Sequence, residues 1–420
     1  MNSAPSLAPA AKALPDGLQA FSHVQGLWRF LANDRVTAAA LAMPLLASAR
    51  QAVAAEESPW VLCVHDWSRL NYKRHHSKHD RLQMTHQHDI GYELQSSLLV
   101  SSRSGVPLGA PAQNLVTAQG VWRWCDEELS PGGATHLDEL TQRMAWLEQQ
   151  QLGSRLVHVI DREADSVAHM RQWQAQDMHW LIRAKSSSTV RCQGQSMRID
   201  RVAEQLSFEP VRQVQRQGQQ LVQHIASAPV VLARAAKPKR LTPQGKRCAP
   251  VPGAPVAARL VISRLVDAQG QQVALWYLLT SLPESVDDAQ VALWYYFRWQ
   301  IESFFKLLKQ AGLQLEAWEQ ESGSAIFKRL LIATQACTLV WQLAARSDRE
   351  ALQAQAFLVR LSGRQTKRSR PVTMPALLDG TFKLLVMLDA LEHYTPEELR
   401  GFANAIIHGS GTEGGSLHAV

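Results

Sequence analysis

Hydrophobic positions between Asp288 and Gly312 recur every three or four residues, which is typical of an amphipathic helix with one buried face. The apolar positions of this face are Trp294, Phe297, Ile301, Phe304, Phe305 and Leu308. Gly312 stands where a glycine cap would end such a helix. The pattern therefore predicts one helix over residues 288–312.

A second stripe, made of polar side chains, follows the same predicted helix. Its members are Tyr295, Arg298, Glu302 and Lys309. At about 100° per residue, these four side chains project within a sector of roughly 60°. A carboxylate flanked by cationic groups is suited to holding a metal ion and a phosphate ester together. Ion pairing on a solvated helix face gives the same spacing, so this alternative stays open.

Two buried strands are predicted to end in aspartates. The apolar runs 60–66 and 155–161 close with Asp66 and Asp161, and open α/β sheets keep their ligands at the carboxyl ends of such strands. With Glu302 they supply three carboxylates, enough to hold two divalent ions about 4 Å apart for an in-line phosphoryl displacement. Each aspartate taken alone could instead be a turn former or a helix cap.

The rest of the chain alternates between helix and strand patterns. Residues 186 to about 270 consist of short alternating runs separated by Gly, Pro and Gln, and we interpret them as a β-rich insertion with a basic loop over 237–247. A basic linker is expected over 362–371. The other expected helices cover 18–55, 137–151, 165–174, 325–346 and 374–407, and the other expected strands cover 91–105, 106–116, 179–185, 258–265 and 273–282.

Composition favours a cytoplasmic protein with a polyanionic partner. The 420 residues carry a net charge of +7 and have a pI near 9.3. The five cysteines show no paired spacing, so neither a disulfide framework nor a thiolate zinc site is predicted. The N-terminus lacks the layout of a signal peptide, and no uninterrupted apolar run approaches the roughly 18 residues that span a bilayer. We therefore expect no membrane association.

The motifs resemble those of a known family. The spacing Tyr295-x2-Arg298-x3-Glu302-x6-Lys309 resembles the Y-R-E-K signature of bacterial insertion-sequence transposases of the DDE class, of the insertion-sequence-four type. The runs that begin at Asp66 and Asp161 look like the two aspartate motifs of that family, in the expected order. The resemblance covers about residues 20–320. It implies an α/β fold with an RNase H-like core, interrupted between the second and third carboxylates by a β-rich insertion.

The resemblance also implies roles for individual residues. Asp66, Asp161 and Glu302 would be the catalytic metal ligands. Arg298 and Lys309 would grip phosphates of the transposon end, and Tyr295 would hydrogen-bond a terminal phosphate. The remaining DNA contacts that it implies come from Arg183, Trp276, which would stack with a flipped-out base, and Trp299, which would support the strand. For Trp276, simple packing in the core is the competing interpretation.

The implied activity is cutting and joining of transposon ends, with two Mg²⁺ ions as cofactors and Mn²⁺ as a substitute. Double-stranded DNA would be the partner, bound by a homodimer. The expected division of the chain is a disordered segment 1–17, a short N-terminal helical region 18–55, a catalytic core 56–185 and 272–320, an insertion 186–271, a C-terminal helical region 321–407 and a flexible tail 408–420.

Two features leave alternatives open. The region before the first strand is short for this family, so a truncated DNA-binding remnant without catalysis is one alternative, and a structure-specific nuclease on the same core is another.

The loop 67–89 carries five histidines, namely His75, His76, His79, His86 and His88. No cysteine joins them and no helical pair with a glutamate is present, so a loop over the active site is preferred to a zinc site.

Overall fold

The computed structural model describes residues 20–133, 135–216, 218–238, 248–310, 313–367 and 372–408 of the chain. Several expectations lie outside these ranges, namely the disorder of 1–17, the cap at Gly312 and nearly all of the tail 408–420. The predicted basic loop 237–247 and the basic linker 362–371 fall only partly within them.

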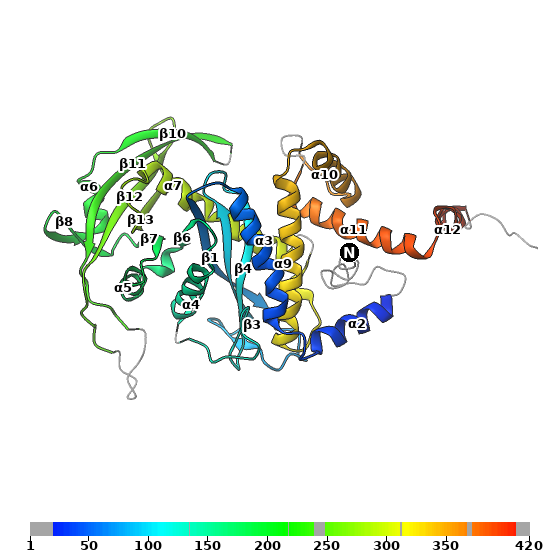
Figure 1. The fold of residues 1–420 in the computed structure, drawn as a ribbon. Coiled ribbons are helices and arrows are strands. Elements are labelled where there is room, and N and C mark those ends of the chain that lie inside the picture. The colour runs from blue at the N-terminus through cyan, green and yellow to red at the C-terminus, as the bar shows by residue number, and fades with distance from the viewer. Residues whose placement is uncertain are drawn as a thin grey trace, which may run out of the picture.

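One mixed β-sheet runs through the described structure (Figure 1). Its strand order is β5-β4-β3-β1-β6-β7-β13-β12-β11-β8-β9, with β2 paired to β3 and β10 paired to β11. The strands up to β7 are β1 (Trp60–Asn71), β2 (Leu82–Gln83), β3 (Ile90–Ser101), β4 (Pro107–Val116), β5 (Val121–Arg123), β6 (Arg155–Ile160) and β7 (His179–Arg183). Those that follow are β8 (Thr189–Cys192), β9 (Gln195–Arg198), β10 (Glu209–Arg216), β11 (Gln219–Leu232), β12 (Val256–Val266) and β13 (Gln272–Thr280).

The part of the sheet around β1 has the arrangement of an RNase H-like core. β1 pairs antiparallel with β3, and β3 with β4. On its other side β1 pairs parallel with β6, and β6 with β7. Parallel neighbours need a crossover between them, and the helices α4 (His136–Gln149) and α5 (Val167–Ala175) lie in the segments that lead into β6 and β7. The predicted α/β fold class is confirmed.

The insertion after β7 extends this same sheet. β13, at the start of the second part of the expected core, pairs antiparallel with β7, and β12 and β11 of the insertion continue outward from it. Its short helix, α6 (Ile199–Glu204), buries Ile199 and Val202. The side chains of β8, β11, β12 and β13 join α5 and β7 in one hydrophobic cluster. The insertion therefore shares a core with the strand that precedes it.

Helices cover both faces of the sheet (Figure 1). Neighbouring residues of β4 show the two sides, because Gln113 donates to Thr334 of α9 (Gly323–Ala345) and Asn114 donates to Glu139 of α4. The other helices are α2 (Ala20–Ala32), α3 (Ala38–Ala55), α7 (Asp288–Phe297), α8 (Trp299–Lys309), α10 (Arg349–Ser362), α11 (Met374–His393) and α12 (Pro396–His408), and two 3₁₀ turns are η1 (Arg162–Ala164) and η2 (Leu315–Ala317).

Helix α3 is the one helix of the described residues that is long and apolar enough, by length and composition, to cross a membrane. The side chains of Leu45, Ala49 and Val53 are buried in the protein. A Cβ placed on Gly109 of β4 would lie 3.2 Å from the Cβ of Ala49, so α3 packs closely on the sheet. Thr37 caps its first turn by accepting from the amide of Ala40.

Strand β1 is longer than the sequence predicted. It was expected to end at Asp66, but it continues to Asn71. Beyond Asp66 its backbone pairs with β3 alone, from Asp66 opposite Ser96 to Asn71 opposite Gly91, because β6 ends at Ile160. The polar run after Asp66 hid this half of the strand, in which Leu70, between exposed Arg69 and Asn71, is the one buried residue.

Gly91→Ala is expected to destabilise the protein by about 1–3 kcal/mol through overpacking. A Cβ on Gly91 would lie 1.9 Å from the carbonyl oxygen of Leu70, so β1 and β3 must separate to admit it. Gly26→Ala, with no atom within 4 Å of the added Cβ, is the matched control. Urea unfolding should show a lower midpoint for the Gly91 variant only, and equal midpoints would contradict this close approach of the strands.

Candidate active site

Asp66 and Asp161 lie side by side on neighbouring strands. The parallel pairing of β1 and β6 ends with His65 opposite Ile160, and the two aspartates are the next residues along the chain, Asp66 within β1 and Asp161 directly after β6. Asp161 caps the 3₁₀ turn η1, since its Oδ1 accepts from the amide of Glu163 at 2.8 Å. Asp161 therefore acts as a helix cap, as the alternative interpretation expected. This cap does not prevent its second carboxylate oxygen from binding a cation.

The predicted helix over 288–312 is divided into α7 and α8 at Arg298. The amide of Arg298 donates to the carbonyl of Tyr295 at 3.1 Å, and the amide of Ile301 donates to the carbonyl of Arg298 at 3.2 Å. Both bonds span three residues, so the chain makes a tighter 3₁₀-like turn there. The expectation of one uninterrupted helix is therefore wrong at this residue, where neither proline nor glycine signals a break.

Arg298 joins two of the predicted carboxylates. Its Nη1 donates to Oδ2 of Asp66 at 2.9 Å, and its Nη2 donates to Oε1 of Glu302 at 2.5 Å. Asp66 and Arg298 are 232 residues apart in the chain. The side chains of all three are mostly shielded from water, with 16% of Arg298, 18% of Asp66 and 29% of Glu302 exposed. One guanidinium group therefore holds the strand carboxylate and the helix carboxylate together.

The three carboxylates act on one another electrostatically. The pKa of Asp66 is raised to about 6 in all: burial raises it most, Arg298 and the amide of Trp67 lower it, and the charges of Asp161 and Glu302 raise it. The three are nevertheless not drawn into a tight cluster, because the only group of three such ligands within 4.8 Å of one another among the described residues lies elsewhere. The guanidinium of Arg298 stands between Asp66 and Glu302.

Lys309 and Tyr295 are held at the two ends of this arrangement. Lys309 donates to the carbonyl of Arg69 in β1 and pairs with Glu316 at 3.3 Å. Glu316 was not anticipated from the sequence, where nothing distinguishes it from any acidic loop residue. Tyr295 is 5% exposed, and burial raises the pKa of its hydroxyl. The stripe of polar residues on α7 and α8 therefore runs along β1, facing Asp66 and Arg69.

The remaining predicted residues flank this stripe. Trp276 of β13 is half-buried and meets Tyr295 edge to face, with ring centroids 5.4 Å apart. Arg183, the last residue of β7, is close enough to Tyr295 to lower the pKa of its hydroxyl. Trp299 is 56% exposed, with Nζ of Lys306 lying 5.5 Å from its ring centroid.

The histidines of the loop 67–89 do not converge on one point. His75 faces Glu319 at 3.8 Å, and Nδ1 of His88 lies 2.9 Å from Nζ of Lys73. Within the part of the chain that the structure describes, no metal-ligand group includes any of them. The zinc alternative for this loop therefore gains no support.

An RNase H-like sheet with one acidic residue within β1, one directly after β6 and one on a later helix has the features of the DDE class of nucleic-acid enzymes. A family model described as the Transposase DDE domain matches residues 127–341, just over half of the 420 residues. The chain belongs to this family of DDE-type transposases. The matched range includes Asp161 and Glu302 but begins after Asp66. Comparison with curated proteins found no match.

Proposed function

We propose that the chain is a cut-and-paste transposase that cleaves DNA at the ends of a mobile element and joins them to a target, in the manner of the Y-R-E-K, insertion-sequence-four type. One observation carries this proposal: Arg298 of the signature bridges Asp66 on the central strand and Glu302 on the helix. A solvated helix face would leave Arg298 paired within its own helix, whereas here its second amino group reaches the strand.

The residues present fit a site for two Mg²⁺ ions, with Mn²⁺ as a substitute. Asp66, Asp161 and Glu302 offer hard oxygen ligands, and the guanidinium between Asp66 and Glu302 indicates that a positive charge is favourable there. When bound, the ions supply activation of the attacking oxygen and stabilisation of the leaving oxygen. The three carboxylates hold this charge in place, and the burial of Asp66 limits the access of competing water.

The cationic residues of the stripe are proposed to bind the DNA backbone. Arg298 and Lys309 would exchange their present carboxylate and carbonyl partners for phosphate oxygens, for which a guanidinium fork is well suited. Tyr295 would donate its hydroxyl to a terminal phosphate, and Arg183 lies nearby to add positive charge. Trp276 would stack with an extruded base and Trp299 would support the strand.

The proposed partner is double-stranded DNA, at the transposon ends and the target, bound by a homodimer in the cytoplasm. The net charge of +7 supports a polyanionic partner. We propose the division given above, in which the core 56–185 and 272–320 carries the chemistry, the insertion 186–271 separates its two parts, and helical regions 18–55 and 321–407 flank it.

The test is cleavage of a DNA fragment that carries the terminal repeat of the element, with Mg²⁺, followed by strand transfer to a plasmid. The parent protein is expected to give cleaved ends and joined products, and Glu302→Gln neither. Cleavage without joining would indicate a structure-specific nuclease. Salt-sensitive binding without any metal-dependent cleavage would indicate a DNA-binding remnant and overturn the proposal.

A further inference from the structure

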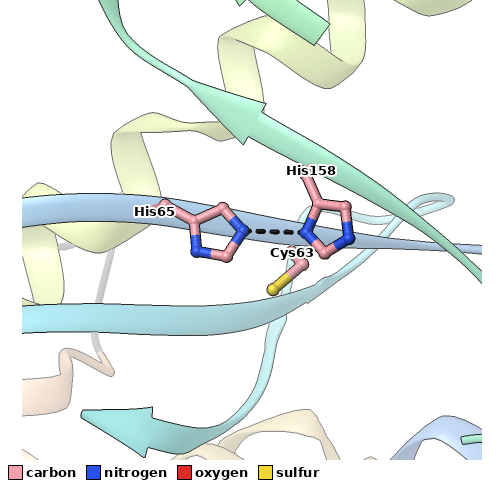
Figure 2. Close-up of side chains that lie close together, drawn as sticks. All are labelled: Cys63, His65 and His158. Atoms are coloured by element: carbon pink, nitrogen blue, oxygen red, sulfur yellow. Dashed lines mark hydrogen bonds between the residues drawn. The ribbon is translucent and has the colours of Figure 1, made fainter. Parts of the chain in front are cut away.

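A buried cluster of metal-ligand types lies on the face of β1 opposite Asp66. Because side chains alternate along a strand, Cys63 and His65 share one face of β1 while Asp66 points to the other. His158 of β6 is in register with Cys63, so it lies on the same face. The donor atoms of these three side chains all lie within 4.8 Å of one another, and none of the three is exposed. Figure 2 shows the three side chains close together.

The two imidazoles already face each other. Nε2 of His65 lies 2.9 Å from Nδ1 of His158, and Figure 2 shows the rings directed at one another with the sulfur of Cys63 beside them. Two nitrogens bound to Zn²⁺ at about 2.0–2.1 Å are roughly 3.3 Å apart at a tetrahedral angle. The pair must therefore open by only about 0.4 Å, and the sulfur must move inward by at most roughly 1.2 Å, to hold an ion.

The outer nitrogens of both rings have the partners that metal-binding histidines need. Nδ1 of His65 lies 2.8 Å from the hydroxyl of Ser97, and Nε2 of His158 lies 3.1 Å from a carboxylate oxygen of Glu148. Ligating histidines characteristically donate their second N–H to such an oxygen, which fixes the tautomer and the ring orientation. With the outer nitrogens protonated, both inner nitrogens present lone pairs to the same point.

We propose that Cys63, His65 and His158 bind one transition-metal ion of the class that prefers imidazole and thiolate, Zn²⁺ or Cu⁺, on the face of the sheet opposite Asp66. Three protein ligands in a dry interior suit either a three-coordinate Cu⁺ or a Zn²⁺ with one added ligand. Burial raises the pKa of the Cys63 thiol, so binding displaces its proton to solvent.

The surrounding charges are compatible with a bound cation. Glu148 contributes a negative charge at the His158 end, and the thiolate of Cys63 would contribute another. The positive charge of Arg143 opposes the binding of a cation, but its guanidinium donates hydrogen bonds to Ser97 at 3.2 Å and to Gln95 at 2.6 Å. Arg143 also favours the thiolate form of Cys63.

The ion would fasten β1 to β6 directly beneath the proposed catalytic aspartates. His65 immediately precedes Asp66, and His158 lies three residues before Asp161. A bound ion would therefore stabilise the two strands that present these aspartates, without itself meeting the DNA. This inference concerns the other face of the sheet and does not depend on the proposed function.

The test uses the full chain, stripped of metal and then titrated with Zn²⁺, with Cu⁺ under reducing conditions, or with Co²⁺ as a spectroscopic probe. Excess Mg²⁺ is present throughout, because it occupies carboxylate oxygens but is a poor partner for a thiolate. About one ion should bind per chain, and the unfolding temperature should rise by about 3 °C at a 100-fold excess over Kd. Co²⁺ should produce the charge-transfer absorption of a cobalt–thiolate bond.

Cys63→Ser is the diagnostic variant and Cys337→Ser its matched control, because both cysteines are free and fully buried. The thermal shift and the cobalt absorption should be lost in the first and retained in the second. Should Cys63→Ser fail to fold, the cobalt spectrum of the parent decides the question. Absence of both signals from the parent, or equal signals from parent and Cys63→Ser, would overturn the proposal and leave the cluster as a hydrogen-bonded chain.

Discussion

Asp66→Asn is expected to reduce DNA cleavage by at least about 10³-fold and, at pH 8, to make the protein more stable. The loss of activity follows from replacing a carboxylate, which binds Mg²⁺ through a charged oxygen, by a neutral amide of the same shape. Asp66 lies before the part of the chain that the family model matches. Its role therefore depends on its position beside Asp161 and on the contact with Arg298.

The gain in stability follows from the raised pKa of Asp66, about 6 in the folded protein against 3.8 ordinarily. Between about pH 4 and pH 6 the folded state binds more protons than the unfolded chain, so this carboxyl contributes most to stability below pH 4 and loses that contribution as the pH rises through 6. At pH 8 the folded parent carries the whole free-energy cost of an ionised, buried Asp66, which is at most about 2–3 kcal/mol. The asparagine variant carries none.

Urea unfolding at pH 4 and pH 8 measures this difference. The stability of Asp66→Asn relative to the parent should be greater at pH 8 than at pH 4. Asp348→Asn is a control of opposite sign, because the hydrogen bond from Arg346 lowers the pKa of Asp348 to about 2, so its stabilising contribution is present at pH 8. That variant should be less stable than the parent at pH 8 and cleave normally. Cleavage by Asp66→Asn within a few-fold of the parent would exclude Asp66 as a ligand.

The local patterns of the sequence predicted much of the fold. The strands expected over 91–105 and 106–116 correspond to β3 and β4, and the apolar run 155–161 predicted β6 with Asp161 directly after it. The second half of β1 was missed because it pairs with residues of β3 that lie about 20 to 30 positions further along the chain, and its own side chains are largely polar. A short stretch of sequence does not show which residues of two strands far apart in the chain will pair with each other.

The site was predictable as a set of residues but not as a set of contacts. The spacing on the helix indicated Arg298 and Glu302 together, yet nothing in it indicated that Arg298 would reach Asp66 across 232 residues. The buried histidines were in principle detectable, because His65 and His158 are polar positions inside two apolar runs. Their meeting depends on the β1–β6 register, which only the three-dimensional structure supplies.

Arg298→Ala is expected to make the stability of the protein depend on Mg²⁺. Without the guanidinium, Asp66 and Glu302 face each other across a partly buried gap with no cation between them. Removing one partner of such a buried pair typically costs 3–5 kcal/mol, and the residual exposure of these side chains reduces the expected loss to about 2–3 kcal/mol. Added Mg²⁺ should restore most of this loss, and it should stabilise the parent less because Arg298 already pairs with both carboxylates.

Activity separates the two roles of Arg298, as a partner of the carboxylates and as a proposed phosphate ligand. Even in saturating Mg²⁺, which restores folding, Arg298→Ala should cleave at least about 10²-fold more slowly because the phosphate contact is absent. Arg298→Lys keeps the charge but cannot bond both carboxylates with a planar fork, so it should lie between parent and alanine variant in both measurements. Thermal unfolding across a Mg²⁺ titration checks the first expectation, and a cleavage time course checks the second. If parent and Arg298→Ala gain the same stability from Mg²⁺, the carboxylates flanking Arg298 are not the site at which the ion binds.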